Sequence, residues 1–328
     1  MRIVVPAGGI GGARFLRGLK AALGIDSPIP DEQSTNAITV IGNTGDDITL
    51  FGLRICPDLD TVMYTLGGGI DEERGWGRTD ETFTVKEELA AYGMRPTWFG
   101  LGDRDTATHI VRAQMLAAGY PLSAVTEALC DRWRPGVRLL PMTDDQVETH
   151  VVIEEDGRRR AIHFQEWWIK YRAAVPAQSI VSMGVEDSKP GPGVLEAIAE
   201  ADLVVLPPSN PVVSVGSVLG VPGIREALAA KTVVGVSPII GGAPVRGMAD
   251  ACLEAIGVET SAGAVAAHLG ADLLDGWLVD EADAGTAVEG IEVRSRPLYM
   301  SDPRATEAIA RAALDLGREL AGRKGGGE

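Results

Sequence analysis

The sequence predicts an α/β fold of Rossmann-like type, with a mainly parallel sheet and helices on both of its faces. Short apolar segments of strand length alternate with longer segments whose apolar residues recur at helical spacing. The first apolar segment leads directly through a run of glycines into a helix, as in sheets that bind ligands at their strand ends. Hydrophobic residues make up 45% of the 328 positions, enough for a large core.

The individual elements follow from spacing and from end signals. Strands are expected at 2–6, 38–42, 97–101, 179–183, 202–206, 232–236 and 276–279. Helices are expected at 12–23, 84–92, 106–118, 121–132, 192–200, 222–230, 247–256, 261–269 and 303–321. Pro121 and Pro222, for example, suit the first turns of two of these helices. Residues 148–154 and 160–168 instead alternate around Asp156-Gly157, which predicts a β-hairpin.

The hairpin and the two helices before it predict an α+β insertion at about 116–174. The rest forms one α/β domain over residues 1–322, followed by a flexible tail at 323–328. The sequence has no apolar run of membrane-spanning length, so no membrane partner is expected. The formal net charge of −16 argues against a nucleic-acid partner. Three well-separated cysteines and the lack of a signal peptide pattern favour a cytoplasmic protein.

Residues 8–12, Gly-Gly-Ile-Gly-Gly, lie between the first strand and the first helix. Glycines let the backbone approach a phosphate closely, and the unpaired N–H groups of the first helical turn point at it. The run lacks the Lys-Ser/Thr ending of a P-loop, and Arg14 stands where the dinucleotide fingerprint has Gly or Ala. The run therefore predicts a phosphate site of another kind, with a plain tight turn as the alternative.

Four further polar turns follow predicted strands, and the carboxyl ends of parallel strands meet at one sheet edge. These turns are 43–47, 102–105, 207–211 and 237–238. Asp46 and Asp47 offer the oxygen ligands that Mg²⁺ takes, although a helix cap or the ribose-binding acid of a dehydrogenase remains open. His109, one turn into a predicted helix, either contacts substrate or is a half-buried histidine.

Several stretches together resemble the 2-phospho-L-lactate transferases of coenzyme F420 biosynthesis, the CofD type, called FbiA in actinobacteria. The matching stretches are 8–14, 43–47, 56–61, 102–105 with Thr108 and His109, and 208–211 with Ser214. The resemblance implies that a phospho-three-carbon acid moves from a guanosine diphosphate donor to the ribityl hydroxyl of the deazaflavin Fo, releasing GMP. The composition is rich in Arg, Ala and Gly, which is typical of a GC-rich genome. It therefore favours the actinobacterial phosphoenolpyruvate type over the phospholactate type.

The resemblance also implies the site residues and the partners. The donor nucleotide and its phosphates are expected at Gly9, Gly11, Gly12, Ala13, Arg14, Ser209, Asn210 and Ser214. Fo is expected at Asn43, Asp47, Thr84, Lys86, Asp103 and His109. Asp47 and Asp46 are the expected catalytic and Mg²⁺-binding pair. The hairpin 148–168 and the stretch 212–221 are candidate homodimer interfaces.

Two other functions remain open from the sequence. One is an NAD(P)-dependent oxidoreductase, suggested by the Rossmann-like start. The other is a non-catalytic regulator that binds a guanine nucleotide.

Overall fold

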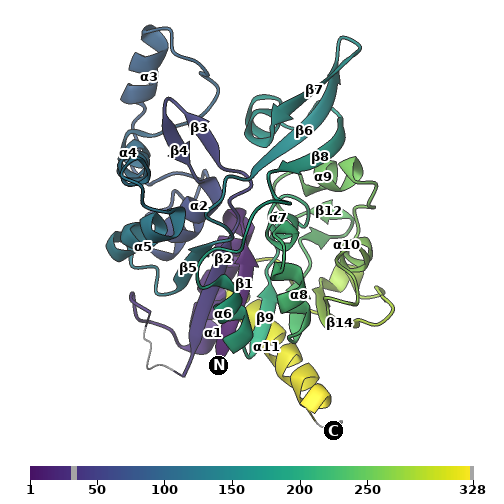
Figure 1. The fold of residues 1–328 in the computed structure, drawn as a ribbon. Helices are drawn as coiled ribbons and strands as arrows, with labels where there is room; N and C mark the ends of the chain where they lie inside the picture. The colour runs from purple at the N-terminus through teal and green to yellow at the C-terminus, as the bar shows by residue number, and fades with distance from the viewer. Residues whose placement is uncertain (31–34, 326–328) are drawn as a thin grey trace.

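The computed structural model describes residues 1–30 and 35–325. Its centre is a seven-stranded sheet in the order β14-β13-β10-β9-β1-β2-β5, with every neighbouring pair parallel (Figure 1). The strands are β1 (Arg2–Ala7), β2 (Ala37–Gly42), β5 (Arg138–Pro141), β9 (Leu203–Leu206), β10 (Val233–Val236), β13 (Gly276–Val279) and β14 (Glu292–Ser295). The predicted Rossmann-like α/β fold is confirmed.

Successive residues of the central strands enter two different apolar layers, because strand side chains alternate between the faces of a sheet. Ile3 and Val5 of β1 pack into one layer, and Val4 packs into the other. The first layer includes α1 (Gly9–Leu23), α2 (Pro57–Leu66), α5 (Leu122–Trp133) and α11 (Pro303–Gly325). The second includes α6 (Val194–Glu200), α7 (Val215–Gly220), α8 (Ile224–Ala229), α9 (Ala249–Ala255) and α10 (Ala262–Leu269). Helices thus cover both faces, as predicted.

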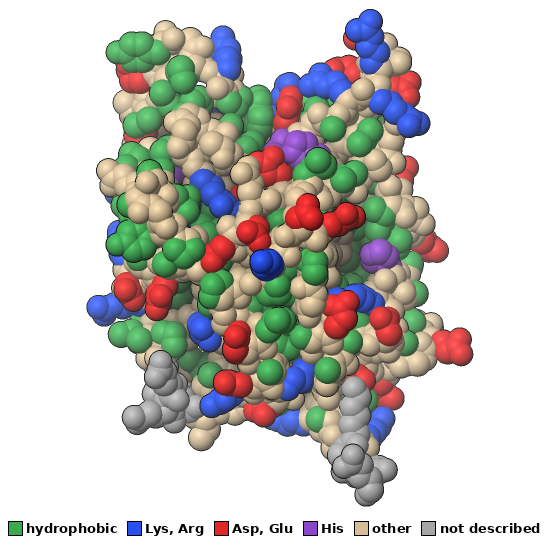
Figure 2. All heavy atoms as spheres, in the orientation of Figure 1, with side chains coloured by type: hydrophobic (Ala, Val, Ile, Leu, Met, Phe, Trp, Pro, Cys, Tyr) green, Lys and Arg blue, Asp and Glu red, His purple; other side chains and the backbone are tan. Residues whose placement is uncertain are grey.

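Two groups of smaller elements extend past the carboxyl ends of the central strands, on opposite sides (Figure 1). One contains the antiparallel hairpin β3 (Ile48–Leu50) and β4 (Leu53–Ile55), with α3 (Thr84–Ala91) and α4 (Asp103–Ala117). The other contains the antiparallel sheet of β7 (Arg158–His163), β6 (Glu148–Glu155) and β8 (Ala177–Met183), a π-helix (Glu166–Lys170), and the pair β11 (Ile239–Ile240) and β12 (Ala243–Pro244). A notch separates the two groups on the molecular surface (Figure 2).

The strand expected at 97–101 is wrong: these residues, which the structure describes, have no strand conformation. Their apolar side chains pack instead against the hairpin β3–β4, where Leu101 is buried beside Trp98 and Phe99. The strand expected at 179–183 exists as β8, but it pairs antiparallel with β6 rather than joining the main sheet. Apolar residues in a sequence predict that a segment is buried, but they do not specify which elements pack against it.

The range expected for the insertion, 116–174, contains β5, which is a strand of the main sheet. The expected hairpin is present as β6 and β7, and Asp156 and Gly157 both have positive φ, 52° and 71°. Its second strand is shorter than the expected 160–168, because it ends at His163 and the π-helix follows. The elements α2, α7 and β14 were not expected from the sequence. A short 3₁₀ turn (Glu281–Asp283) follows β13.

Two further expectations concern the surface and the chain end. Val215, Val218 and Val221 are buried in the second core layer, so most apolar side chains of the stretch 212–221 are not available to a dimer interface. Helix α11 continues to Gly325, and the remaining tail residues, 326–328, lie outside the described residues. Within the described ranges, none of the helices combines the length and the apolar character needed to cross a bilayer.

Candidate active site

A cavity of about 680 Å³ lies at the carboxyl ends of four adjacent strands, β10, β9, β1 and β2. Residues of the turn that follows each strand line it: Ser237 after β10, Ser209 after β9, Gly9 after β1 and Asp46 after β2. The turn at 102–105 follows no strand and instead begins α4. Its residue Asp105 lines the same cavity. This edge is the ligand-binding position of open parallel sheets.

The glycines at the start of α1 make room for other parts of the site. A Cβ atom on Gly11 would lie 2.6 Å from the carbonyl oxygen of Pro208, and one on Gly12 would lie 2.5 Å from Ser209 Oγ. A Cβ atom on Gly8 would lie 2.2 Å from a carboxylate oxygen of Asp58. The helix begins at Gly9, three residues earlier than expected, so most of the glycine run is its first turn. Glycine is thus needed here for close packing within the chain.

The first turn of α1 offers N–H groups to the cavity. The Gly9 N–H donates to Asp58 Oδ1 at 2.8 Å, while Ile10 and Gly11 continue along the cavity wall. The first N–H groups of a helix have no partner within it, and the helix dipole favours negative charge there. Of the residues expected to bind the donor, the cavity is lined by Gly9, Gly11, Arg14, Ser209, Asn210 and Ser214. The other two, Gly12 and Ala13, are buried behind this wall.

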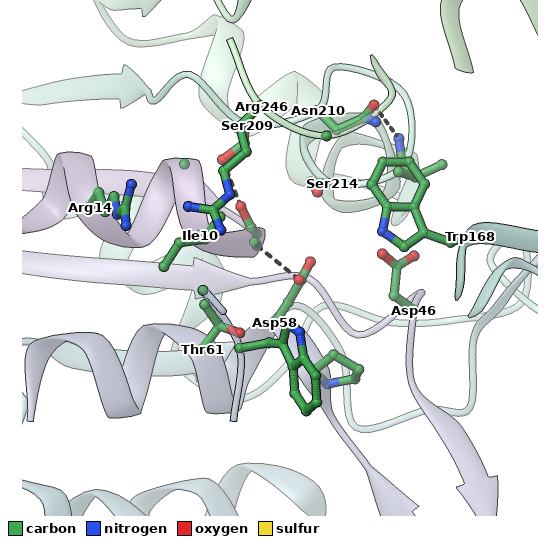
Figure 3. A pocket seen from close by; sticks show the side chains of 18 of the residues that line it. Ile10, Arg14, Asp46, Asp58, Thr61, Trp168, Ser209, Asn210, Ser214 and Arg246 are labelled. Carbon is green, nitrogen blue, oxygen red and sulfur yellow. Dashed lines mark hydrogen bonds between the residues drawn. The ribbon is translucent and has the colours of Figure 1, made fainter. Parts of the chain in front are cut away.

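Asp46 and Asp58 both line the cavity, and Figure 3 shows both carboxylates directed into it. Asp58 lies in the first turn of α2 and accepts from Gly9 and from Asn43 Nδ2, the latter at 2.8 Å. Burial raises the pKa of Asp58 to about 6. Burial, with the negative charges of Asp58 and Asp47, raises the pKa of Asp46 well above its usual range.

The Asp46–Asp58 pair fits a divalent cation. Asp46 Oδ1 is buried and makes no hydrogen bond to any described residue. The negative charges of two neighbouring carboxylates repel each other, and a bound cation relieves this repulsion. Mg²⁺ prefers carboxylate oxygens as ligands, together with water and phosphate oxygens. The residues present therefore suit the expected Mg²⁺. Of the expected pair, Asp46 and Asp47, only Asp46 belongs to this site.

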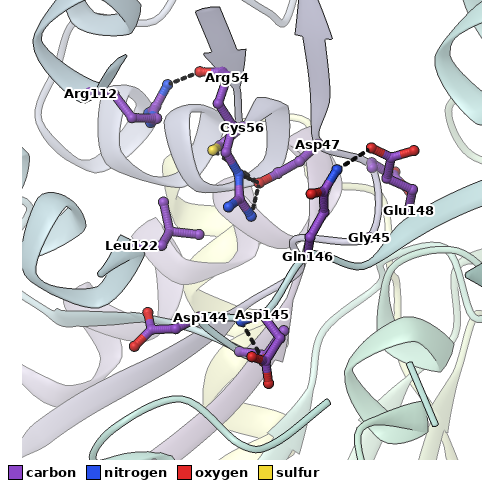
Figure 4. Close-up of polar contacts among 12 residues, drawn as sticks. Gly45, Asp47, Arg54, Cys56, Arg112, Leu122, Asp144, Asp145, Gln146 and Glu148 are labelled. Carbon is purple, nitrogen blue, oxygen red and sulfur yellow. Dashed lines mark hydrogen bonds and ion pairs between the residues drawn. The ribbon is translucent and has the colours of Figure 1, made fainter. Parts of the chain in front are cut away.

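Asp47, the other member of that pair, does not line the cavity. Its carboxylate accepts from Arg54 Nε at 2.9 Å and from the Cys56 thiol at 3.0 Å (Figure 4). Burial raises the pKa of Asp47 to about 6, and the charge of Arg54 opposes this rise. Its carbonyl oxygen lies 3.0 Å from His163 Nε2. These contacts tie the turn after β2 to β4 and β7.

The residues expected to bind Fo are dispersed. Asn43 is fully buried and donates to Asp58 and to the Val213 carbonyl, while its own side-chain oxygen accepts from Gly45. Asp103 accepts from Thr82 and from two N–H groups at the start of α3. Among these expected residues, all within the described ranges, Asn43, Asp47, Thr84, Lys86 and Asp103 are absent from the cavity lining. His109 lines it.

His109 belongs to a buried polar cluster between α2 and α4. Arg112 pairs with Asp60, and Tyr64 donates to Asp105 Oδ1 at 2.6 Å. Arg112 Nη1 lies 2.9 Å from His109 Nδ1. Because a guanidinium only donates, Nδ1 accepts and the ring proton lies on Nε2.

Asp60, Asp105 and His109 are close enough to hold a metal ion, with candidate ligand atoms within 4.8 Å of one another. A neutral imidazole that binds a metal through Nε2 carries its proton on Nδ1, and Arg112 occupies that position. Arg112 also pairs with Asp60. The cluster therefore fits a hydrogen-bonded network between two helices better than a metal site.

Several lining residues were not assigned from the sequence. Trp76, Phe99 and Trp168 supply aromatic surface, and Arg74 and Arg246 supply positive charge. Asp58 had a sequence signal: Pro57 followed by two acids is typical of a helix start, and α2 begins there. The sequence could not assign the aromatic residues to the site, because their approach to the cavity depends on tertiary packing.

Comparisons with known proteins identify the family of the chain. The sequence pattern of the family described as 2-phospho-L-lactate transferase CofD matches residues 3–309. The chain is 77% identical over 320 residues to a phosphoenolpyruvate transferase of Thermobifida fusca, covering 98% of this chain and 99% of the relative. A phosphoenolpyruvate transferase of Streptomyces griseus is 69% identical over 326 residues, covering 98% and 99%.

Among solved structures, a Bacillus halodurans protein of the UPF0052 family superposes with a TM-score of 0.58. It shares 20% sequence identity and covers 95% of this chain and 98% of its own, so this likeness concerns the fold alone. The family pattern spans nearly the whole chain, and the sequence relatives match along nearly their full length. The chain therefore belongs to the CofD family of 2-phospho-L-lactate transferases.

Proposed function

We propose that the protein transfers a phospho-three-carbon-acid group from a guanosine diphosphate ester to the ribityl hydroxyl of Fo, releasing GMP, in coenzyme F420 biosynthesis. The observation that carries the proposal is one cavity lined both by an anion-binding helix start and by two carboxylates, Asp46 and Asp58, that form no ion pair with the described residues. Its volume of about 680 Å³ is ample for ligands of this size. High identity to proteins named phosphoenolpyruvate transferase supports enolpyruvate, rather than lactate, as the three-carbon acid.

The start of α1 suits the diphosphate of the donor. The Gly9 N–H already donates to Asp58, but the following N–H groups of the first turn and the helix dipole favour an anion, and Arg14 adds positive charge on the same wall. Ser209, Asn210 and Ser214 supply polar side chains next to it, which supports a role in holding the nucleotide. Ser209 Oγ donates to the Gly8 carbonyl at 2.8 Å, so this turn and α1 form one unit.

Asp46 and Asp58 are the residues that would hold Mg²⁺. When bound there, the ion would supply positive charge against the diphosphate and the departing GMP. Asp46 faces the cavity and Asp47 does not, which supports Asp46 as the catalytic carboxylate of the expected pair. Asp47 then acts as a positioning residue, since Arg54 holds it within the turn that carries Asp46.

The aromatic residues suit the flat ring system of the acceptor. Trp76 and Trp168 both line the cavity, and Arg74 lies over the Trp76 ring at 5.3 Å from its centre. Such surfaces bury planar ligands well. His109 also lines the cavity, but its Nε2 is buried 3.4 Å from Asp105 Oδ1, so a positioning role through Asp105 suits it better than a direct contact with the acceptor.

The reaction exchanges one phosphorus–oxygen bond for another. The ribityl oxygen bonds to the phosphorus that carries the three-carbon acid, and the bond from that phosphorus to the GMP oxygen breaks. The hydroxyl proton leaves to water or to Asp46. In such transfers, holding the reactants in line and neutralising charge supply most of the rate enhancement.

The test supplies purified protein with Fo and either the enolpyruvyl or the lactyl ester of guanosine diphosphate, with and without Mg²⁺. We expect equal amounts of GMP and product, faster turnover with enolpyruvate, and loss of turnover with a chelator. Tight NADH binding without GDP binding would contradict the proposal in favour of an oxidoreductase. GDP binding with no product from either ester would contradict it in favour of a regulator.

A further inference from the structure

Arg246 reaches the cavity from the loop between β12 and α9. Figure 3 shows its side chain directed into the cavity, in the part that Ile10 and Arg14 also line. Arg246 thus brings a positive charge to the anion-binding wall from a segment more than two hundred residues away in the sequence.

One backbone contact holds the guanidinium across the cavity mouth. Arg246 Nη2 donates to the Arg74 carbonyl oxygen at 3.0 Å. A Cβ atom on Gly75 would lie 2.4 Å from that same nitrogen, and Gly75 also has a positive φ of 74°. Glycine at residue 75 therefore leaves room for the guanidinium, which joins this loop to the loop that carries Arg246.

The loop that carries Arg246 has a constrained conformation. Gly241, Gly242 and Gly247 have φ values of 58°, 78° and 79°, which other residues rarely adopt. A Cβ atom on Gly247 would lie 3.3 Å from the ring of Trp168, so the loop packs directly against that indole. The backbone that carries Arg246 thus packs against Trp168, and the bond to Arg74 orients the guanidinium toward the cavity.

The other arginines near the cavity have acidic partners, and Arg246 has none in the described part of the chain. Arg14 and Arg17 pair with Glu72, and Arg74 pairs with Asp71. A guanidinium has several N–H donors in a rigid fork, and the Arg74 carbonyl takes one of them. Arg246 is exposed at the cavity, so its remaining N–H donors are open to a ligand.

We propose that Arg246 is a substrate-binding residue whose guanidinium fork pairs with an oxyanion of the donor. Planar forks bind carboxylate and phosphate oxygens in the same two-bond geometry, so the ligand group is the three-carbon carboxylate or the diphosphate. The inference rests on the proposed function for the identity of the donor. The bond to Arg74 uses one guanidinium nitrogen of Arg246 and leaves the others available. Arg246 can therefore bind the ligand while it still joins the two loops.

The test compares Arg246→Gln and Arg246→Lys with Arg318→Gln, a control on α11 whose only described ion pair is with Asp315. Calorimetry without Fo measures the Kd of GDP and of the enolpyruvyl diphosphate ester, so the result does not depend on turnover. We expect Arg246→Gln to weaken binding of the ester at least tenfold. Arg246→Lys should lie between Gln and wild type, because it keeps the charge and loses the fork.

The two ligands distinguish the two oxyanions. Weaker binding of the ester with unchanged GDP binding assigns Arg246 to the carboxylate, and equal weakening of both assigns it to the diphosphate. Ester and GDP binding within twofold of wild type in Arg246→Gln, with an unchanged melting temperature, would overturn the inference. Wild-type protein that binds the ester but makes no product when Fo is added would overturn the proposed function alone.

Discussion

The two walls of the cavity differ in the sign of what they offer. The α1 wall, residues 8–14 with the turn at 207–214, presents N–H groups, hydroxyls and Arg14. The α2–α4 wall, residues 58–64 of α2 with 105–112 of α4, presents carboxylates, a histidine and a tyrosine. A ligand with an anionic end and an alcohol end would bind such a cavity in one orientation. Electrostatics as well as shape would therefore set the orientation of such a ligand.

The largest expected effect concerns the charge balance of the α2–α4 wall. Arg112→Met would leave Asp60 buried without its partner, which should lower the free energy of unfolding by about 3–5 kcal/mol. Urea unfolding measures this, and adding Asp60→Asn should recover part of the loss. GDP affinity below the melting temperature should stay near wild type, because the α1 wall is untouched. A loss below about 1 kcal/mol, as for exposed pairs, would mean that water screens this cluster.

The next effect separates the two adjacent aspartates. Asp46→Asn removes a buried charge that Asp58 and Asp47 oppose, so the unfolding free energy without metal should rise by about 1 kcal/mol. The same change should lower kcat/KM by about 100-fold, as for other lost electrostatic groups. Asp47→Asn should instead lower the melting temperature, because it leaves the largely buried Arg54 guanidinium without its charged partner, and keep most activity where folded. The opposite pattern would return the catalytic role to Asp47.

A smaller effect probes the packing of the α1 wall. Gly11→Ala places a methyl group 2.6 Å from the Pro208 carbonyl oxygen, which the backbone must move to relieve, at about 1–3 kcal/mol of stability. GDP binding should weaken with it. Gly322→Ala is the matched control, since it lies in α11 with no described atom within 4 Å of its Cβ position. Helix propensity predicts a gain there of up to about 1 kcal/mol. Equal stability and equal GDP affinity of Gly11→Ala and Gly322→Ala would refute the role of close packing.

The smallest effect is a pH dependence outside both walls. Burial lowers the pKa of His163, whose Nδ1 accepts from the Gln165 N–H, so its Nε2 proton faces the Asp47 carbonyl. Below about pH 6.5 the unfolded chain gains a proton that the folded protein binds less readily, so His163 costs stability as the pH falls. Asp58, whose pKa is raised to about 6, acts in the opposite direction.

A comparison with His163→Gln therefore isolates the histidine. The urea midpoint of this variant should fall less than that of wild type between pH 7.5 and 5.5. A parallel decline of the two midpoints would show that this histidine does not titrate over that interval.

The sequence predicted the α1 wall far better than the α2–α4 wall. Gly9 and Ser209 follow strands that are adjacent in the sheet, so local pattern and topology together bring them to one edge. Asp60 and His109 come from two helices separated by a long stretch of chain, and only tertiary packing joins them. The same limit explains residues 97–101, whose apolar side chains face a hairpin rather than a sheet. Mg²⁺, the homodimer and a cytoplasmic location stay predictions.

The lining of the cavity runs from Gly8 to Ser301, which has a consequence for how the protein unfolds. A ligand held by segments from nearly the whole chain binds only the complete native state, so its binding free energy adds to global rather than local stability. At one hundred times its Kd, a ligand should add about 2.7 kcal/mol. Backbone amides in both helical layers should then exchange with solvent more slowly together, and a thermal shift becomes a direct screen for the substrates.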